Sequence, residues 1–273
     1  MSVLTEKRKP FAKIFVSIII VMILFYLAPD WVQRKLALNY RTFSFLNSFD
    51  FLRLYTMHFV HKKARHLLGN LIPFIVVFPM LYYLAEASDD LITFKRFLFF
   101  TLVLLPPVLA LVDLPILRAY GFVYGMGFSG IDMAFVGALP YFTGRYLKRK
   151  LNFDVSPILL TQSLLLFFTA VIAYIYGMVV VWVALLIGTL SMLVAPVKTA
   201  FEEYDKMFGK NARRFKCSVF FFILLSMGVS LPVIWGAFPK QLTESFGLVD
   251  VVLHYLGLFS TLYIFPLINE KLS

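Results

Sequence analysis

Apolar residues along this chain form long continuous runs rather than short strands or single amphipathic faces. Each run is close to the roughly 20 residues that a helix needs to cross the hydrocarbon core of a bilayer. The runs predict eight membrane-spanning helices in one membrane domain over residues 1–273, and an all-α, polytopic fold. The predicted spans are Phe11–Ala28, His66–Ala85, Phe94–Val112, Gly127–Tyr146, Pro157–Tyr176, Met178–Val197, Cys217–Gly236 and Leu248–Ile268.

Composition supports the same class. Of 273 residues, 60% are hydrophobic and 15% are charged, and the mean hydropathy is +0.83. No soluble domain of this length needs so much apolar surface. The single cysteine, Cys217, excludes an intrachain disulfide framework. The formal net charge of +11 is spread between apolar runs, which favours contact with anionic lipid and gives no sign of nucleic-acid binding.

The first run follows Lys7-Arg8-Lys9 and resembles a signal peptide. No small-x-small cleavage site follows it, so we expect a retained first membrane helix. The fifth and sixth runs are separated only by Gly177, which indicates a tight hairpin.

Basic residues set the expected orientation. They gather in residues 145–150 and 198–216, and such loops lie on the cytoplasmic side. With eight spans, both termini are then expected in the cytoplasm, for a multi-pass protein of the cell membrane. The long loop at 29–65 is also basic although this orientation places it outside. A long loop follows the rule less strictly.

Ionisable and polar groups inside a bilayer are costly, and each is a candidate for function. The first is Ser129 in Gly127-Phe128-Ser129-Gly130. The glycines allow close backbone approach and expose the hydroxyl, as a nucleophile requires. The alternative is a serine bonded back to its own helix.

The second candidate is His254, which Gly257 follows one turn later. With the expected orientation, Ser129 and His254 enter the membrane from the outer side at similar depth. A nucleophile and its general base must meet in this way. The alternative is a histidine that only bonds to a neighbouring helix.

The third candidate lies around the start of the second run. His66 and Asn70 are four residues apart and share one helix face, where their N–H groups can stabilise an oxyanion. The competing interpretation is a metal site formed by His58, His61 and His66. No Asp, Glu or Cys lies among these histidines, and the zinc-protease pattern His-Glu-x-x-His is absent.

Two carboxylates are close to these residues in sequence. Asp132 lies one turn after Ser129 and is expected to be neutral, solvated or paired. Asp250 lies four residues before His254 and either orients its imidazole or caps the last helix, with capping favoured. We expect no carboxylate to act as a third catalytic member.

Together these residues resemble the rhomboid family of intramembrane serine proteases. The family pattern Trp-Arg-x-x-Thr-x-x-x-x-His-x-x-x-x-His-x-x-x-Asn is matched by this chain except at its tryptophan, where Leu52 stands. The matching positions are Arg53, Thr56, His61, His66 and Asn70, then Gly127, Ser129 and Gly130 of Gly-x-Ser-Gly, and His254 and Gly257 of His-x-x-Gly. The match covers three stretches in the family's order. Met133 and Thr261 also depart from the residues usual in the family.

The resemblance implies a six-helix core, here with two extra helices between the serine and the histidine. It implies an endopeptidase that cleaves transmembrane segments of other proteins with a Ser129–His254 dyad, in a water-filled cavity open to the outer face. His66, Asn70 and the Ser129 backbone N–H would hold the oxyanion. Arg53 would shape the rim, and Gly257 would pack on Gly130. No cofactor or metal is expected. Two rivals stay open: an inactive relative that binds client helices, and a small transporter or metal channel.

Overall fold

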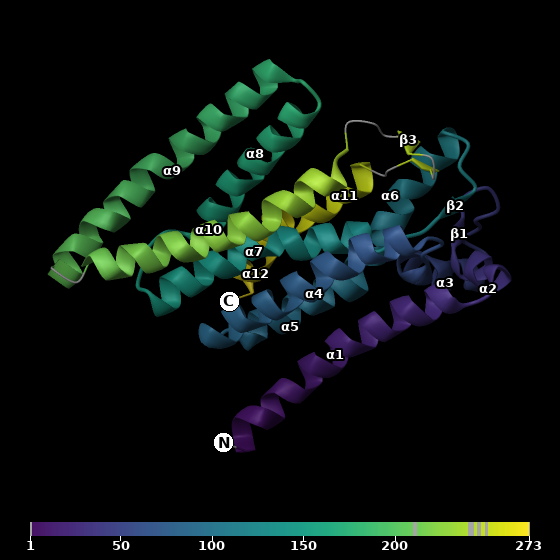
Figure 1. The fold of residues 1–273 in the computed structure, drawn as a ribbon, viewed down its shortest axis with the longest axis horizontal. Coiled ribbons are helices and arrows are strands. Elements are labelled where there is room, and N and C mark those ends of the chain that lie inside the picture. Colours follow the sequence, from purple (N-terminus) through teal and green to yellow (C-terminus); the bar gives the residue numbers. More distant parts are fainter. Residues whose placement is uncertain (1, 210–211, 240–242, 245–246, 249–250, 273) are drawn as a thin grey trace.

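Helices form almost all of the regular structure, as the apolar runs predict. The computed structural model describes residues 2–209, 212–239, 243–244, 247–248 and 251–272. Its helices are α1 (Ser2–Leu27), α2 (Asp30–Leu36), α3 (Ser48–Thr56), α4 (Ala64–Ala87), α5 (Leu91–Phe99), α6 (Leu105–Ala119), α7 (Ser129–Lys150), α8 (Pro157–Ile175), α9 (Val179–Phe208), α10 (Ala212–Ala237), α11 (Val251–Phe259) and α12 (Phe265–Lys271). The expected all-α, polytopic fold is confirmed (Figure 1).

Short turns and strands complete the chain. A 3-10 turn, η1 (Met57–Phe59), follows α3, and π-helical turns η2 (Phe100–Leu104) and η4 (Ser260–Ile264) join α5 to α6 and α11 to α12. Two-residue strands form two antiparallel pairs. They are β1 (Leu38–Asn39) with β2 (Tyr124–Gly125), and β3 (Thr243–Glu244) with β4 (Gly247–Leu248).

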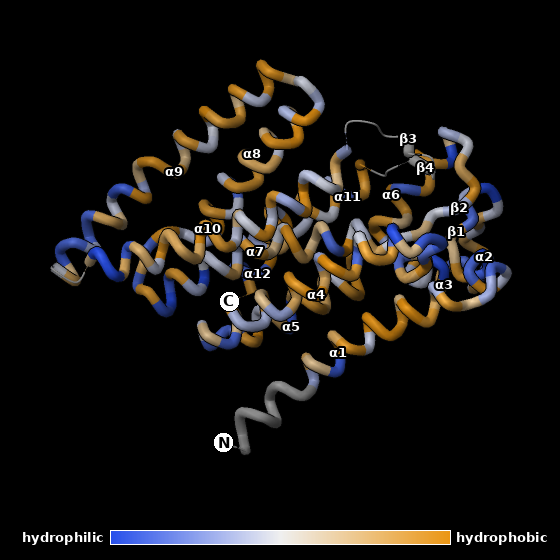
Figure 2. Tube along the Cα trace, viewed as in Figure 1, coloured by the Kyte–Doolittle hydropathy of each residue, from blue (hydrophilic) through white to orange (hydrophobic). Residues whose placement is uncertain are grey.

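Within the described residues, seven helices are long and apolar enough to cross a membrane, and all seven coincide with predicted spans. They are Pro10–Leu27, Ala64–Ala87, Leu91–Ala119, Pro157–Ile175, Val179–Phe208, Ala212–Ala237 and Val251–Lys271. Figure 2 shows these helices as mostly hydrophobic segments.

The remaining predicted span is α7, a helix of 22 residues that is less apolar than the others. Residues 130–145 of this helix are all buried. Helices α4, α8, α10 and α11 pack around it. Because neighbouring helices screen α7 from lipid, its surface does not need to be apolar, and it can carry small and polar residues.

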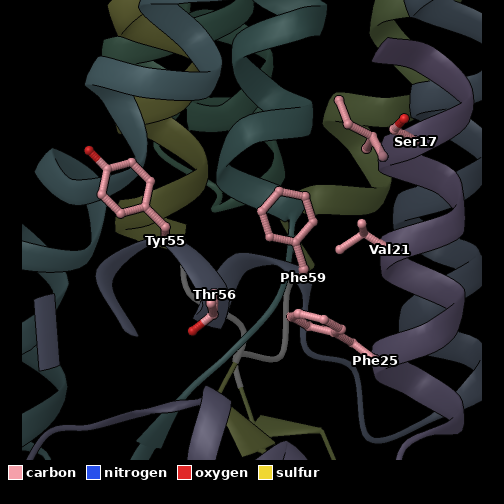
Figure 3. Close-up of a pocket in the computed structure, with 7 residues that line it drawn as sticks. Ser17, Val21, Phe25, Tyr55, Thr56 and Phe59 are labelled. Atoms are coloured by element: carbon pink, nitrogen blue, oxygen red, sulfur yellow. The ribbon is translucent and has the colours of Figure 1, made fainter. Parts of the chain in front are cut away.

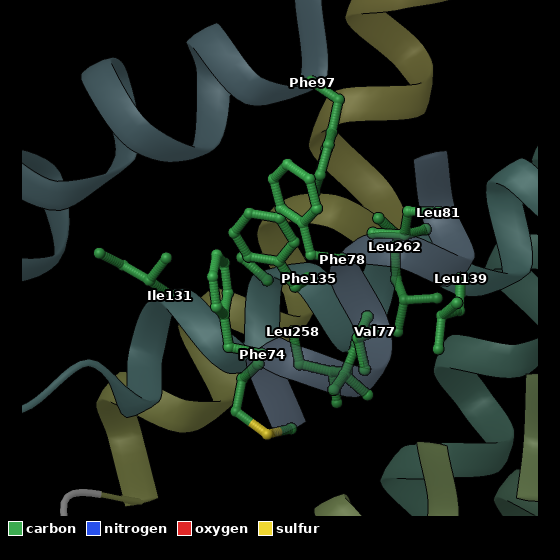
Figure 4. Close-up of a cluster of buried hydrophobic side chains, with 14 of the residues drawn as sticks. Phe74, Val77, Phe78, Leu81, Phe97, Ile131, Phe135, Leu139, Leu258 and Leu262 are labelled. Atoms are coloured by element: carbon green, nitrogen blue, oxygen red, sulfur yellow. The ribbon is translucent and has the colours of Figure 1, made fainter. Parts of the chain in front are cut away.

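Aromatic and aliphatic side chains fill the space between α7 and its neighbours. Figure 4 shows Phe74 and Phe78 of α4 beside Phe135 of α7, with Leu258 and Leu262 contributed by the last membrane segment. The rings of Phe74 and Phe135 meet edge to face with centroids 5.3 Å apart. This cluster fixes the three helices that carry the candidate site residues.

The loop after α1 is an ordered structure that lies against the start of α7. Strand β1 pairs with β2, so residues 38–39 of the loop bond to the segment just before Gly127. Thr56 donates a hydrogen bond to the Leu36 carbonyl at 2.7 Å, and the guanidinium Nε of Arg53 donates to the Lys35 carbonyl at 2.8 Å. These bonds connect α2 to α3 and hold the loop in one conformation.

Helices α8 and α9 form the tight hairpin that Gly177 predicts. Gly177 has φ +73°, a conformation that other residues rarely adopt, and α9 begins two residues later. Helix α9 then runs along the outside of the bundle (Figure 1). Only 6% of its most apolar stretch is buried, so its surface suits contact with lipid.

Candidate active site

Ser129 is the first residue of α7 and lies at a sharp change of backbone direction. Gly127 has φ +125°, and Phe128 is the residue that precedes the helix. The Phe128 ring is buried and packs against Phe59 and Phe74, with ring centroids 5.5 Å apart in both pairs. Ser129 itself is half-buried. The first N–H groups of a helix have no partner inside that helix, so the Ser129 N–H is placed to donate to a ligand.

Gly127 brings the backbone against the two candidate oxyanion residues. A Cβ atom added there would lie 2.7 Å from Cε1 and 2.8 Å from Nε2 of His66, and 3.9 Å from Nδ2 of Asn70. Both side chains come from the first two turns of α4. His66 and Asn70 therefore lie beside the segment that leads into Ser129. Only glycine at position 127 leaves room for them.

His61 orients the Asn70 amide. Its Nδ1 donates to the Phe59 carbonyl at 3.1 Å, because a carbonyl oxygen can only accept. Its Nε2 then accepts from Asn70 Nδ2 at 2.7 Å. Burial, with a smaller effect from His66, lowers the pKa of His61 to about 3. His61 is therefore neutral near pH 7, and its bond fixes which way the Asn70 carboxamide points.

The other side of Ser129 lies against the helix that carries His254. A Cβ atom added to Gly257 would collide with the carbonyl oxygen of Gly130. A Cβ added to Gly130 would lie 3.0 Å from Cγ of Leu253. Ser129 directly precedes Gly130, and His254 directly follows Leu253. The glycine contact thus brings the two candidate catalytic residues to the same level of the α7–α11 pair.

The close approach continues along the same two helices. A Cβ atom at Gly137 would lie 2.5 Å from Oγ1 of Thr261 and 2.7 Å from the Leu258 carbonyl oxygen. Thr261 stands where the rhomboid pattern has a smaller residue, and Gly137 provides the necessary space from the opposite helix. This departure from the pattern therefore does not separate the helices.

His254 is held in a defined tautomer. Its Nδ1 lies 2.7 Å from the carbonyl oxygen of Ala237, the last residue of α10. A carbonyl accepts only, so the proton is on Nδ1 and the neutral ring keeps a lone pair on Nε2. A general base needs that lone pair. The Ala237 carbonyl thus occupies the nitrogen at which a triad carboxylate would bind.

An aromatic ring packs against His254, although Met133 does not supply one. Phe238 is fully buried, and its ring meets the imidazole edge to face at a centroid distance of 5.9 Å. Sequence reasoning missed both Ala237 and Phe238. An alanine that acts through its carbonyl leaves no signature in a sequence, and an apolar ring among many has none that distinguishes it.

Arg53 lies in the loop and not among the residues around Ser129. It pairs with buried Asp50, bonds to the Lys35 carbonyl, and lies over the Phe49 ring at 4.8 Å. These contacts give it a structural role within the loop after α1.

Two carboxylates lie close in sequence to the candidate catalytic residues, Asp132 after Ser129 and Asp250 before His254. Asp132 is buried in α7, and among the described residues neither carboxyl oxygen has a hydrogen-bond partner. Asp250 lies outside the described residues.

Two of the three histidines proposed as a metal site form hydrogen bonds to other groups. His58 bonds to the Pro106 carbonyl, and His61 bonds to Phe59 and Asn70. His66 lies against Gly127. In the part of the chain that the structure describes, no group of three His, Cys, Asp or Glu side chains could hold a metal ion.

An apolar groove of about 300 Å³ lies beside the site, between α1 and the α3–η1 segment (Figure 3). Ser17, Val21 and Phe25 line it from α1, and Tyr55, Thr56 and Phe59 from the loop. Neither Ser129 nor His254 borders it. Phe59 connects the groove to the site through its ring contact with Phe128.

Fold and site together define a multi-pass, all-α membrane protein with a serine, two histidines and an asparagine gathered at one end of its central helix. Compared with known proteins, the chain matches no family model, no curated protein and no solved structure.

Proposed function

We propose that the chain is an intramembrane serine endopeptidase of the rhomboid type, with Ser129 as nucleophile and His254 as general base. The observation that carries the proposal is the pair of glycines flanking Ser129. Gly127 is in contact with His66 and lies near Asn70, and Gly130 is in contact with the helix of His254. A nucleophile, a base and two oxyanion donors are thereby drawn from three helices to one place.

The chemistry follows from the roles of these groups. Nε2 of His254 takes the proton of the Ser129 hydroxyl as its oxygen attacks the scissile carbonyl. The Ser129 backbone N–H, His66 and Asn70 donate to the oxyanion that forms. His254 then returns the proton to the leaving amine, and water, activated by the same imidazole, releases the acyl group from Ser129.

The substrate is a transmembrane segment of another protein. A peptide bond within an intact helix is shielded by its own hydrogen bonds, so the segment must unwind locally before Ser129 can attack. Helix-breaking residues near the bond should therefore favour cleavage. This chemistry needs no metal or other cofactor.

The protein lies with both termini in the cytoplasm, as the basic loops at 145–150 and 198–216 favour. A cysteine-accessibility experiment in a Cys217→Ser background tests this orientation. Gly177→Cys should react with an impermeant maleimide applied to intact cells, and Arg149→Cys should not. The reverse pattern would overturn the orientation.

The proposal is tested by incubating the purified protein with a model transmembrane substrate. Wild type should cleave it, while Ser129→Ala and His254→Ala should lose nearly all cleavage and keep the wild-type thermal unfolding profile, because the dyad acts as a unit. Full cleavage by either variant would refute the assignment. A folded wild type that binds such helices and never cleaves them would instead favour the inactive, client-binding rival.

A further inference from the structure

His58 is a buried polar residue to which the proposed mechanism gives no role. It lies in η1, fully buried, and its Nε2 lies 2.9 Å from the carbonyl oxygen of Pro106 in the first turn of α6. Because that oxygen can only accept, Nε2 carries the proton and donates. A buried donor and acceptor joined in this way connect the loop after α1 to α6.

The residue before His58 in the loop, Met57, is bonded to Gly127. The carbonyl of Met57 accepts the Gly127 N–H at 3.0 Å. Burial lowers the pKa of His58, the residue that follows Met57 in the chain, to about 4. His58 is therefore a neutral residue between α6 and the segment that leads into Ser129.

Gly127 is thus contacted by two segments. Its N–H is bonded to the Met57 carbonyl, and a Cβ atom there would meet His66, with Asn70 nearby. Ser129 follows two residues later, as the first residue of α7. A shift of Gly127 would change the position of the Ser129 N–H relative to the two side-chain donors. Misplacement of a reacting group by about 1 Å can cost about a hundredfold in rate.

We propose that His58 is a positioning residue for the proposed reaction. It anchors the Gly127–Ser129 backbone on α6, and thereby sets the distance between the Ser129 N–H and the donors His66 and Asn70. This inference rests on the proposed function. It differs from a general packing role because it requires the hydrogen bond to Pro106 and not merely a side chain of the right volume.

The test compares two unbranched side chains of similar size. His58→Gln can still donate to the Pro106 carbonyl, whereas His58→Met cannot. Turnover and Michaelis constant are measured on a model transmembrane substrate, together with thermal unfolding and the affinity for a peptidyl aldehyde. The aldehyde forms a tetrahedral adduct on Ser129 and so reports on the oxyanion donors.

Tyr55→Phe is the matched control. The Tyr55 hydroxyl also joins the loop to the same membrane segment, but through the Val103 carbonyl at 3.2 Å and not through Pro106. His58→Met should lower turnover by up to about a hundredfold at a nearly unchanged Michaelis constant, and should weaken aldehyde binding similarly. His58→Gln should recover most of both, and Tyr55→Phe should match wild type.

Four outcomes would count against the inference. They are wild-type turnover in His58→Met, equal losses in the Met and Gln variants, a loss confined to the Michaelis constant, and an equal loss in Tyr55→Phe. Each refutes the positioning role while leaving an active wild type and the proposed function intact. Absence of cleavage and of aldehyde binding in wild type would instead refute the proposed function, and the positioning role with it.

Discussion

The two ends of α7 are fixed by different kinds of interaction. At its C-terminal end, buried Arg145 pairs with Asp90 before α5 and with Glu270 of α12, the latter at 2.9 Å. Tyr141 also donates to Glu270 at 2.9 Å. At its N-terminal end, about 24 Å away along the helix axis, the close contacts involve glycines: Gly127 lies against His66, and Gly130 lies against Gly257.

The C-terminal end of α7 is held by ion pairs, whereas the proposed catalytic residues lie at its N-terminal end. Ion pairs at the C-terminal end tie the serine helix to the last membrane segment with strong, directional bonds. At the other end the same two segments meet through Gly130 and Gly257, and this contact involves no charged side chain. There His254 Nδ1 is bonded to the Ala237 carbonyl, and the carboxyl oxygens of buried Asp132 have no hydrogen-bond partner among the described residues.

Among the comparisons between the two ends of α7, the largest effect is expected at the proposed oxyanion donors. Asn70→Ala and His66→Ala should each lower turnover by about a hundredfold, with a smaller change in the Michaelis constant, because a donor to developing charge is lost. Steady-state kinetics on a model substrate measures both. A raised Michaelis constant at unchanged turnover would assign these residues to substrate binding instead.

The second-largest effect is expected at the contact between Gly257 and Gly130. Gly257→Ala places a methyl group against the Gly130 carbonyl and forces the α7–α11 pair apart, so we expect a loss of turnover of about a hundredfold or less, with lowered thermal stability. Gly228→Ala in α10 is the control, because an added Cβ there meets nothing within 4 Å. Similar turnover in the two variants would show that the contact between Gly257 and Gly130 does not determine the rate.

At the opposite end of α7 the effect should fall on stability and not on chemistry. Arg145→Leu leaves buried Asp90 with the more distant Arg149 as its remaining ion-pair partner among the described residues, and breaking a buried pair typically costs about 3–5 kcal/mol. Thermal unfolding should show this loss, while turnover per folded molecule changes little. Lys150→Ala, which removes an exposed pair with Asp89, should leave the unfolding temperature nearly unchanged. A collapse of turnover in folded Arg145→Leu would mean that the two ends are coupled.

The smallest effect is expected for Asp132→Asn. No hydrogen bond joins its carboxyl oxygens to any described residue, and His254 Nδ1 is already bonded to the Ala237 carbonyl. Loss of a triad aspartate costs about 10⁴-fold in turnover, and we expect far less than that here. A loss of that size in a folded variant would identify Asp132 as a third catalytic member.

Much of the fold could be predicted from hydropathy. Seven predicted spans coincide with long apolar helices, and Gly177 gave the α8–α9 hairpin. Helix α7 was predicted from its apolar run at Gly127–Tyr146, whereas its burial on all sides depends on how the other helices pack. The order within the loop after α1 was not predictable, because backbone bonds such as those to Leu36 and Lys35 have no residue signature.

For the candidate site too, some residues could be named from the sequence and others could not. Side chains with distinctive chemistry, such as Ser129, His254, His66 and Asn70, could be named from sequence because they are rare within apolar runs. The groups that orient them could not. Ala237 acts through its carbonyl, and His58 was grouped with the other histidines as a candidate metal ligand, although the structure bonds it to Pro106.

Labelling with a fluorophosphonate, mapped by mass spectrometry, tests the central claim most directly. The reagent reacts only with a serine whose hydroxyl is activated by a base. Wild type should carry one modification, on Ser129, and Ser129→Ala should carry none. His254→Ala should label far more slowly, while Arg145→Leu should keep the wild-type rate. A folded wild type that remains unlabelled, or one labelled at another serine, would contradict the account.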